Sequence, residues 1–360
     1  MTFTFGKDFK IQVFGESHGE GIGVVVEGCP PGLEIDMAQI QTELNRRRPG
    51  TGTLVSPRSE SDVFEIRSGV FKGKTTGAPL VMTIHNRNVD SSSYEEMKDT
   101  PRPGHADYTA RVKYRGYNDY RGGGFLSGRL TAAMVMGGSI ARQLLKERGI
   151  DVLAHVLQIG NVSVERNLTD DEIRSNVYSN PVRSGDIEAV ERMKAVIERV
   201  NQEGDSIGGV IECRIIGTPA GIGEPIFDSV ESVVSHAMFS IPAVKGIEFG
   251  SGFRGAALRG SENNDPLVIE DGKVTWTQNN AGGVLGGITS GAPVVFRLAI
   301  KPTPSISRPQ RTVDVVKMEE TTLEIRGRHD PCIVPRAMPA VEGLTAVVMA
   351  DLVKRSTAKI

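Results

Sequence analysis

Aromatic side chains are scarce in this sequence and make up 5% of its 360 residues. Proteins that bind single-stranded nucleic acid without sequence preference stack the bases on aromatic rings. Domains that bind nucleic acid are also usually basic, whereas this chain has a formal net charge of −2 and a pI near 6.4. The composition therefore argues against nucleic acid as the main partner.

Cysteine and long apolar runs are equally scarce. The three cysteines, Cys29, Cys213 and Cys332, show no CxxC spacing, so neither a disulfide framework nor a zinc site is expected, and a reducing compartment is indicated. The sequence has no apolar run near the length of a membrane span and no signal-peptide pattern. It also has no HxH, HExxH or DxD spacing. We expect a cytoplasmic protein without a metal site.

Glycine is abundant instead, with 42 residues, which predicts many tight turns or close approaches to a ligand. The richest stretch is RPGHADYTARVKYRGYNDYRGGGFLSGR, residues 102–129. It contains six basic residues and two acidic ones, a local charge of +4. A segment so basic and so rich in glycine buries little apolar surface, so we interpret it as an anion-binding loop.

Periodicity and turn signals predict alternating strands and helices that form one interwoven domain over residues 1–360. Residues 87–126 show little periodicity and are expected to form a long functional loop. Thr169 with Glu172, and Asp228 with Glu231, fit capping boxes at helix starts. Strands are expected at 10–14, 22–28, 62–71, 79–86, 152–162, 208–217 and 293–300, and helices at 37–48, 127–149, 170–179, 188–204, 229–238 and 340–355.

Two segments resemble nucleotide-binding motifs but lack features that those motifs require. Gly250, Gly252 and Gly255 match GxGxxG, but the following AALRGSENNDP cannot form the helix that binds pyrophosphate. The segment GVFKGKTT resembles a P-loop, yet only three residues separate Gly69 from Gly73 where four are required. Neither a Rossmann site nor a Walker A site is expected.

Histidines in loops are the candidates for acid–base chemistry. His18 and His105 are each flanked by glycine and short polar residues, in segments where catalytic groups concentrate. His155 and His236 lie within apolar runs, which is more typical of structural histidines. We therefore take His18 and His105 as the general acid or base candidates.

Arginines supply the candidate anion ligands. Arg46, Arg47 and Arg48 are consecutive at a predicted helix C-terminus, where they could simply complement the helix dipole. Further arginines lie in glycine-rich loops, and guanidinium groups suit carboxylates and phosphates. These loop arginines are Arg58, Arg102, Arg121, Arg129 and Arg328. The residues alone indicate an enzyme acting on a small anion, with a non-catalytic anion- or RNA-binding protein as the alternative.

Taken together, the motifs resemble the chorismate synthase family. They occur in family order and span nearly the whole chain: GESHGEGIGVVVEGCP, RRRPGT, RPGHADYT, YRGGGFLSGRLTA, AVKGIEFGSGF, AGGVLGGITSG, KPTPS and GRHDPC. The resemblance implies an α+β fold, a β-α-β sandwich with helices packed between antiparallel sheets, assembled as a homotetramer. It implies a carbon–oxygen lyase of the shikimate pathway, which leads to the aromatic amino acids. This lyase converts 5-enolpyruvylshikimate-3-phosphate to chorismate by anti 1,4-elimination of phosphate, with reduced FMN and no net redox change.

The resemblance also implies site residues. His18, His105 and Asp330 match the catalytic positions: His18 would protonate the departing phosphate, His105 would lie near the flavin, and Asp330 would relay a proton. The matching FMN-binding positions are Phe125, Leu126, Ser127, Pro242, Ala243, Gly286, Lys301, Pro302, Thr303, Pro304, Ser305 and Arg328. The matching substrate-binding positions are Arg47, Arg48, Arg58, Arg102 and Arg129, and Arg47 is also assigned to NADPH in some members.

Two departures from the family pattern affect the flavin site. Leu126 stands where many members have a serine, so one hydroxyl near the flavin phosphate is missing. Pro242 replaces a residue that is often asparagine, which removes an amide and a backbone donor. Bifunctional members carry inserted segments that this chain lacks. We therefore expect an external flavin reductant, with NADPH acting only indirectly.

Overall fold

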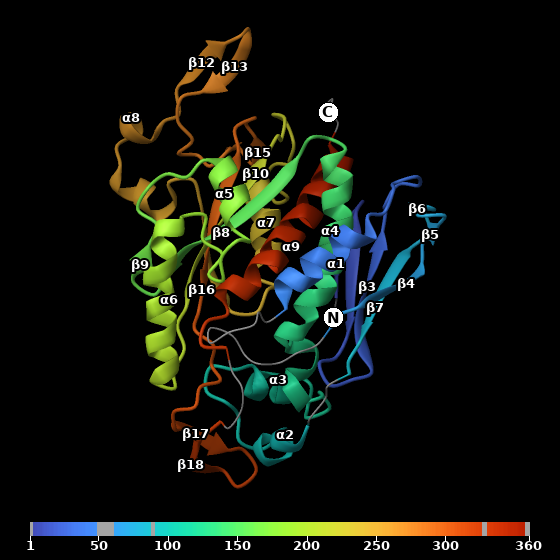
Figure 1. The fold of residues 1–360 in the computed structure, drawn as a ribbon, viewed down its shortest axis with the longest axis vertical. Helices are drawn as coiled ribbons and strands as arrows, with labels where there is room; N and C mark the ends of the chain where they lie inside the picture. Colours follow the sequence, from blue (N-terminus) through green and yellow to red (C-terminus); the bar gives the residue numbers. More distant parts are fainter. Residues whose placement is uncertain (1–2, 49–60, 88–90, 326–329, 357–360) are drawn as a thin grey trace.

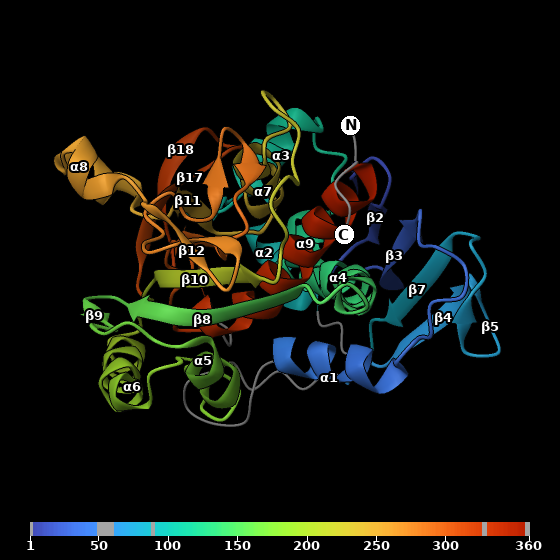
Figure 2. The ribbon, with the colours of Figure 1, turned by 90° about the horizontal axis from the view of Figure 1, so that it is seen from above.

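Two antiparallel sheets enclose a layer of helices (Figures 1 and 2). A computed structural model describes residues 3–48, 61–87, 91–325 and 330–356. Each of the two main sheets has five strands. This arrangement confirms the predicted α+β sandwich with helices between the sheets.

The first sheet has the order β1-β2-β3-β7-β4. Residues alternate between its two faces, because successive side chains of a strand point to opposite sides. In β2, Ile11 and Val13 are buried against the helices, whereas Gln12 and Phe14 are exposed on the outer face. The strands are β1 (Thr4–Phe5), β2 (Lys10–Gly15), β3 (Gly21–Glu27), β4 (Phe64–Ser68) and β7 (Leu80–His85).

The second sheet has the order β11-β16-β10-β8-β9. Ile211, Cys213 and Ile215 of β10 are buried, and the Cys213 sulfur lies 3.8 Å from the Thr345 hydroxyl of the C-terminal helix. That helix therefore covers the inner face of the sheet. The strands are β8 (Asp151–Ile159), β9 (Val162–Ser163), β10 (Gly209–Ile216), β11 (Val244–Phe249) and β16 (Val294–Ile300).

Three helices fill the space between the sheets: α1 (Met37–Arg47), α4 (Thr131–Lys146) and α9 (Val334–Arg355). α4 and α9 cross closely at a pair of glycines. A Cβ atom on Gly138 would lie 2.3 Å from the Gly343 Cα atom, so no other residue fits there. Asp36 caps α1 through its side chain, which accepts a hydrogen bond from the Gln39 amide and confirms the predicted start of this helix.

The other elements surround this sandwich (Figure 1). The short helices α2 and α3 and the hairpin β17–β18 lie together at one end, and the hairpin β12–β13 projects at the other. These elements are β5 (Val70–Phe71), β6 (Lys74–Thr75), α2 (Ser92–Met97), α3 (Asp107–Lys113), η1 (Arg121–Leu126), η2 (Gly128–Leu130), α5 (Asp170–Asn176), α6 (Ile187–Gln202), α7 (Val230–Met238), η3 (Gly252–Ala257), α8 (Gly260–Asn263), β12 (Leu267–Glu270), β13 (Lys273–Trp276), β14 (Val284–Leu285), β15 (Ile288–Thr289), β17 (Gln310–Asp314) and β18 (Glu319–Leu323).

Several sequence-based boundaries were wrong. Residues 87–126 contain α2 and α3 rather than a continuous loop, and α9 begins at Val334, because the proline that follows it is tolerated in the first turn of a helix. Ser229, not Asp228, caps α7, and Asp228 pairs with Arg355 at 2.9 Å instead. The Thr169 capping box is confirmed. None of the helices in the described part of the chain has the length and apolarity needed to cross a membrane.

Candidate active site

His18 and His105 both lie against one glycine turn. Gly122, Gly123 and Gly124 all have positive φ angles, of 59°, 84° and 55°, which favour glycine. A Cβ atom on Gly122 would lie 2.4 Å from the His18 Cδ2 atom, and one on Gly123 would lie 3.4 Å from the His105 Cε1 atom. The turn therefore brings together two histidines that are far apart in sequence.

The loop that carries His18 joins β2 to β3 and is held by Asn86. The side-chain nitrogen of Asn86 (Nδ2) donates to the backbone carbonyl oxygens of Glu16, at 2.9 Å, and Gly19, at 3.0 Å. The Ser17 amide donates to the Gly124 carbonyl at 3.1 Å, which ties this loop to the glycine turn. The imidazole Nδ1 of His18 lies 2.9 Å from the Ser91 hydroxyl. His18 is thus positioned by backbone contacts on both sides.

His105 lies just before α3 and contacts two charged side chains. Its Nδ1 atom is 2.6 Å from an Asp107 carboxylate oxygen and 3.1 Å from an Arg102 nitrogen. The Lys301 ammonium donates to the Gly104 carbonyl at 2.6 Å, which brings the KPTPS loop against this segment. His105 therefore lies where two distant loops meet.

The predicted flavin-binding segments at 243 and 301–305 do meet beside His105. The Lys301 amide donates to the Ala243 carbonyl at 2.9 Å, and Arg102 donates to the Ser305 hydroxyl at 3.3 Å. The Thr303 hydroxyl is buried and lacks a hydrogen-bond partner among the described residues. A buried hydroxyl without a partner is costly in a finished structure, so this loop retains capacity for a polar ligand.

The segment after the glycine turn faces two different spaces. Phe125 packs edge-on against Phe3 and Tyr114, at ring-centroid distances of 5.4 and 5.2 Å. Leu126 is exposed and lines a hollow of about 160 Å³ together with His105. The Ser127 hydroxyl accepts a hydrogen bond from the Arg129 amide at 3.3 Å. Phe125 therefore faces the first sheet, and Leu126 faces His105.

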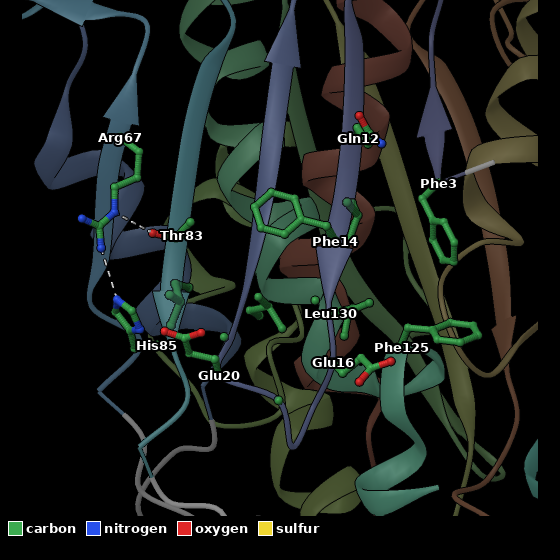
Figure 3. A pocket seen from close by; sticks show the side chains of 16 residues that line it. Phe3, Gln12, Phe14, Glu16, Glu20, Arg67, Thr83, His85, Phe125 and Leu130 are labelled. Carbon is green, nitrogen blue, oxygen red and sulfur yellow. Dashed lines mark hydrogen bonds between the residues drawn. The ribbon is translucent and has the colours of Figure 1, made fainter. Parts of the chain in front are cut away.

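Figure 3 shows the cavity that Phe125 lines, a space of about 670 Å³ on the outer face of the first sheet. Phe3, Phe14 and Leu130 contribute apolar walls. At one side Arg67 lies 3.2 Å from His85 and 3.3 Å from the Thr83 hydroxyl. The cavity adjoins the site through Phe125 and the loop at 15–19, but neither His18 nor His105 lines it.

Two of the predicted substrate arginines share one buried carboxylate. Asp62 lies 2.7 Å from the Arg47 Nη2 atom and also pairs with Arg129. Burial alone would raise the pKa of Asp62, but the two guanidinium groups outweigh it and hold that pKa below its ordinary value. Burial lowers the pKa of Arg47 to about 10, so Arg47 stays charged at neutral pH. The cluster therefore carries a net positive charge.

Asp330 lies beside the same cluster through Arg336. Arg336 pairs with the Asp330 carboxylate and donates from Nε to the Arg47 carbonyl at 3.4 Å. Arg48 follows Arg47, and its Nη1 atom lies 3.4 Å from the Asn45 side-chain oxygen. The side chain of Asn86 links the arginine cluster to the His18 loop. Its Oδ1 atom accepts a hydrogen bond from Arg129 at 3.2 Å, and its Nδ2 atom donates to the His18 loop.

The predicted position Gly286 is not joined to this arrangement by the contacts of the described residues. Gly286 lies in the turn between β14 and β15, and no hydrogen bond among the described residues joins it to the site. Its neighbour Gly287 accepts from Val230 at the start of α7, whereas Ala243 follows the other end of that helix. Arg58 and Arg328 lie outside the described residues.

Sequence reasoning missed four residues that hold the site together: Asp62, Asn86, Asp107 and Arg336. Asp107 carried a local signal, since it follows His105 by two residues inside a basic segment. Asp62, Asn86 and Arg336 carried none, because their partners come from distant segments. Positive charge at one end and two histidines around a turn suit an anionic substrate that needs proton transfer.

Comparison with known proteins agrees with this chemistry. The family model described as Chorismate synthase matches residues 9–353. Proteins named chorismate synthase from Korarchaeum cryptofilum and Thermococcus kodakarensis are 52% and 51% identical. The alignments cover 98% of this chain in both cases, with 97% and 98% of the relatives. The structure is similar to a crystal structure of chorismate synthase, with 30% sequence identity and a TM-score of 0.77. The alignment covers 97% of this chain and 93% of the chain in that crystal structure. The chain therefore belongs to the chorismate synthase family.

Proposed function

We propose that the chain catalyses the anti 1,4-elimination of phosphate from 5-enolpyruvylshikimate-3-phosphate, giving chorismate. The observation that carries this proposal is the placement of His18 and His105 around the Gly122–Gly124 turn, next to a cationic cluster. The substrate has two carboxylates and a phosphate, which match guanidinium groups. A phosphate leaving group needs a proton donor, which a histidine can supply.

Reduced FMN is the cofactor that we assign to this site, and when bound it supplies electron density to the substrate. The fit rests on the loop at 301–305, where the Thr303 hydroxyl is buried and has no hydrogen-bond partner among the described residues, and where the Lys301 ammonium donates to the carbonyl of Gly104, next to His105. Leu126, with Pro242 and Ala243, would form further walls, whereas Phe125 and Ser127 are proposed from the motif, because the Phe125 ring faces the first sheet. No hydrogen bond among the described residues joins Gly286 to this group, so Gly286 is proposed from the motif alone. Arg328 is proposed from the motif alone.

Each side chain has an assigned task. His18 donates the proton to the departing phosphate, and His105 holds a proton near the flavin. Asp330, which pairs with Arg336, relays a proton. Arg47, Arg48 and Arg129 bind the substrate anions, and Arg58 is added to them from the motif alone.

We infer that the flavin is reduced by an external system, with NADPH acting only indirectly. The inference rests on the family resemblance, because this chain has 360 residues and lacks the inserted segments that bifunctional members carry. The test is purified protein with oxidised FMN and NADPH. Sustained chorismate formation under those conditions would contradict the inference.

We also propose a homotetramer in the cytoplasm. The outer face of the first sheet supports association, because no helix in the described part of the chain covers it (Figure 2) and because Phe3 and Phe14 are exposed. Apolar patches of this kind are typical of protein contacts. Light scattering of the purified protein tests the proposal, and a monomer at micromolar concentration would contradict it.

An anaerobic assay with photoreduced FMN tests the function. We expect chorismate and phosphate to appear in equal amounts and to stop when the flavin is oxidised. If no product forms with reduced flavin and saturating substrate, the lyase proposal fails. Substrate binding without turnover would then favour the anion-binding alternative.

A further inference from the structure

The carboxylate of Asp107 joins His105 to Arg102. Arg102 donates to it three times: from Nε at 2.7 Å, from Nη2 at 2.8 Å and from the backbone amide at 3.1 Å. The Oδ1 atom of Asp107, which accepts from Arg102 Nη2, also lies 2.6 Å from the His105 Nδ1 atom. Two parallel guanidinium–carboxylate hydrogen bonds fix orientation as well as distance. Asp107 is therefore held rigidly against the imidazole ring.

This geometry selects one tautomer of His105. A guanidinium only donates hydrogen bonds and a carboxylate only accepts them. Nδ1 must therefore carry its proton if it bonds to Asp107, and must lack it if it bonds to Arg102. The Asp107 contact is the shorter, at 2.6 Å against 3.1 Å. A carboxylate oxygen this close to a nitrogen without a proton would repel it, so the proton is assigned to Nδ1 toward Asp107, and Nε2 remains for exchange with a ligand.

The remaining nitrogen faces the glycine turn. A Cβ atom on Gly123 would lie 3.4 Å from Cε1 and 3.7 Å from Nε2 of His105. No side chain is present at that position, so the ring edge is open toward the turn. The same edge carries the nitrogen that the Asp107 contact leaves without a fixed proton.

We propose that Asp107 is a positioning residue for His105, and that Arg102 serves Asp107 rather than the substrate. The proposal rests on the function inferred above for His105. In this arrangement Asp107 holds the Nδ1–H tautomer and presents Nε2 to the flavin side. The charge of Arg102 is already balanced by the Asp107 carboxylate, whereas Arg47 and Arg129 share the single carboxylate of Asp62. Arg102 therefore offers little net charge to an anionic substrate.

Asp107 stays ionised throughout the working pH range. Burial alone would raise the pKa of Asp107, but hydrogen bonds from Arg102 and His105 outweigh it and hold that pKa well below its ordinary value. An ionised carboxylate is the form that can accept the proton on Nδ1. The pair therefore acts as in other His–carboxylate arrangements, where the second partner sets the tautomer.

The other charged groups around His105 do not compete for Nδ1. Asp99 pairs with Arg111 at 2.8 Å and Asp119 pairs with Arg121 at 2.9 Å. No hydrogen bond among the described residues links either carboxylate to His105. Asp99→Asn is thus a matched control, because it removes a carboxylate–arginine pair from the same hollow. The titratable groups facing this hollow are Tyr94, Lys98, Asp99, Arg102, Asp107, Arg111, Asp119 and Tyr120, with Lys301 on the adjoining loop.

The test reads the tautomer directly, by ¹⁵N NMR of histidine-labelled, flavin-free protein. The His105 signals are identified by their loss in His105→Gln. We expect Nδ1–H in the wild type and in Asp99→Asn, and a shift toward Nε2–H in Asp107→Asn. An unchanged tautomer in folded Asp107→Asn would overturn the proposal. If Asp107→Asn folds poorly, Asp107→Glu, which keeps the charge, is measured in its place. It should retain part of the Nδ1–H signal of the wild type.

Kinetics separate positioning from substrate binding. We expect Asp107→Asn to lower kcat roughly 10- to 100-fold, as for other partners that orient a functional histidine, with KM for the substrate changed less than about 3-fold. Its half-maximal activity should move to lower pH. Arg102→Ala should act in the same direction, and the double variant should be no worse than the poorer single one. A large rise in KM with unchanged kcat in Arg102→Ala would return Arg102 to the substrate.

The two readouts fail independently. If wild-type protein shows no turnover with reduced FMN, the proposed function fails while the NMR result still tests the Asp107–His105 geometry. If turnover is normal and the tautomer does not respond to Asp107, only the positioning role fails.

Discussion

Gly122 and His18 are in contact so close that no side chain fits between them. A Cβ atom on Gly122 would lie 2.4 Å from His18 Cδ2 and 2.6 Å from Nε2. Any other residue at this position must push the imidazole away or distort the turn. The conformation of the turn and the position of the proposed acid are therefore coupled.

Gly122→Ala should lower kcat by roughly 10²-fold or more, because displaced acid–base groups lose most of their effect. The measurement is steady-state turnover with photoreduced FMN. Gly116→Ala is the matched control: Gly116 also has a positive φ, of 79°, but a Cβ atom there would meet nothing within 4 Å. Both substitutions place an alanine at a positive φ, which lowers the free energy of unfolding by a similar amount, about 1 kcal/mol. Equal loss of activity in both would contradict the coupling.

Asp62→Asn should destabilise the fold by about 3–5 kcal/mol, because it leaves buried Arg47 and Arg129 without their counter-charge. Denaturant unfolding at pH 7 measures this loss. Replacing Glu65, an exposed acid that pairs with Arg67, by Gln is the control and should cost less than about 1 kcal/mol.

The same carboxylate predicts how stability depends on pH. The pKa of Asp62 is lower in the folded state than in the unfolded chain. Its contribution is therefore complete above the unfolded pKa of about 4 and is lost as the pH falls through the folded value. The difference in stability between wild type and Asp62→Asn should shrink on acidification below about pH 4. A difference that grows there would contradict the ion-pair assignment.

Asn86→Ala should lower kcat/KM by roughly 10- to 100-fold, because the His18 loop loses its hydrogen bonds to the Glu16 and Gly19 carbonyls. Asn86→Asp separates the two functions of this residue. It keeps an acceptor for Arg129 but has no amide donor for the loop. If Asn86→Asp retained wild-type activity while Asn86→Ala lost it, the contact with Arg129, rather than the loop, would be the important one.

Individual strands and helices could be predicted from local signals, whereas their arrangement as a sandwich came from the family resemblance and the site depended on contacts between distant segments. The β-branched content of 10–14 and the signal for a helix starting at 37 were local, and both elements are confirmed. α2 and α3 were missed because each spans only two turns or fewer within a polar, glycine-rich stretch. The meeting of Asp62 with Arg47 and Arg129 depends on three separate elements. No local pattern encodes such a contact, although the family resemblance located the arginines. The single-domain organisation stays a prediction.

Turnover of the two histidine variants tests the central claim most directly. His18→Ala and His105→Ala are compared with wild type in the anaerobic assay with photoreduced FMN and saturating substrate. His236→Ala, an exposed histidine on α7, serves as the control. We predict that each site variant loses roughly 10²–10⁴-fold in kcat, while the control stays within about 2-fold of wild type. Wild-type turnover in either His18→Ala or His105→Ala would contradict the claim that these two residues flank the reacting centre.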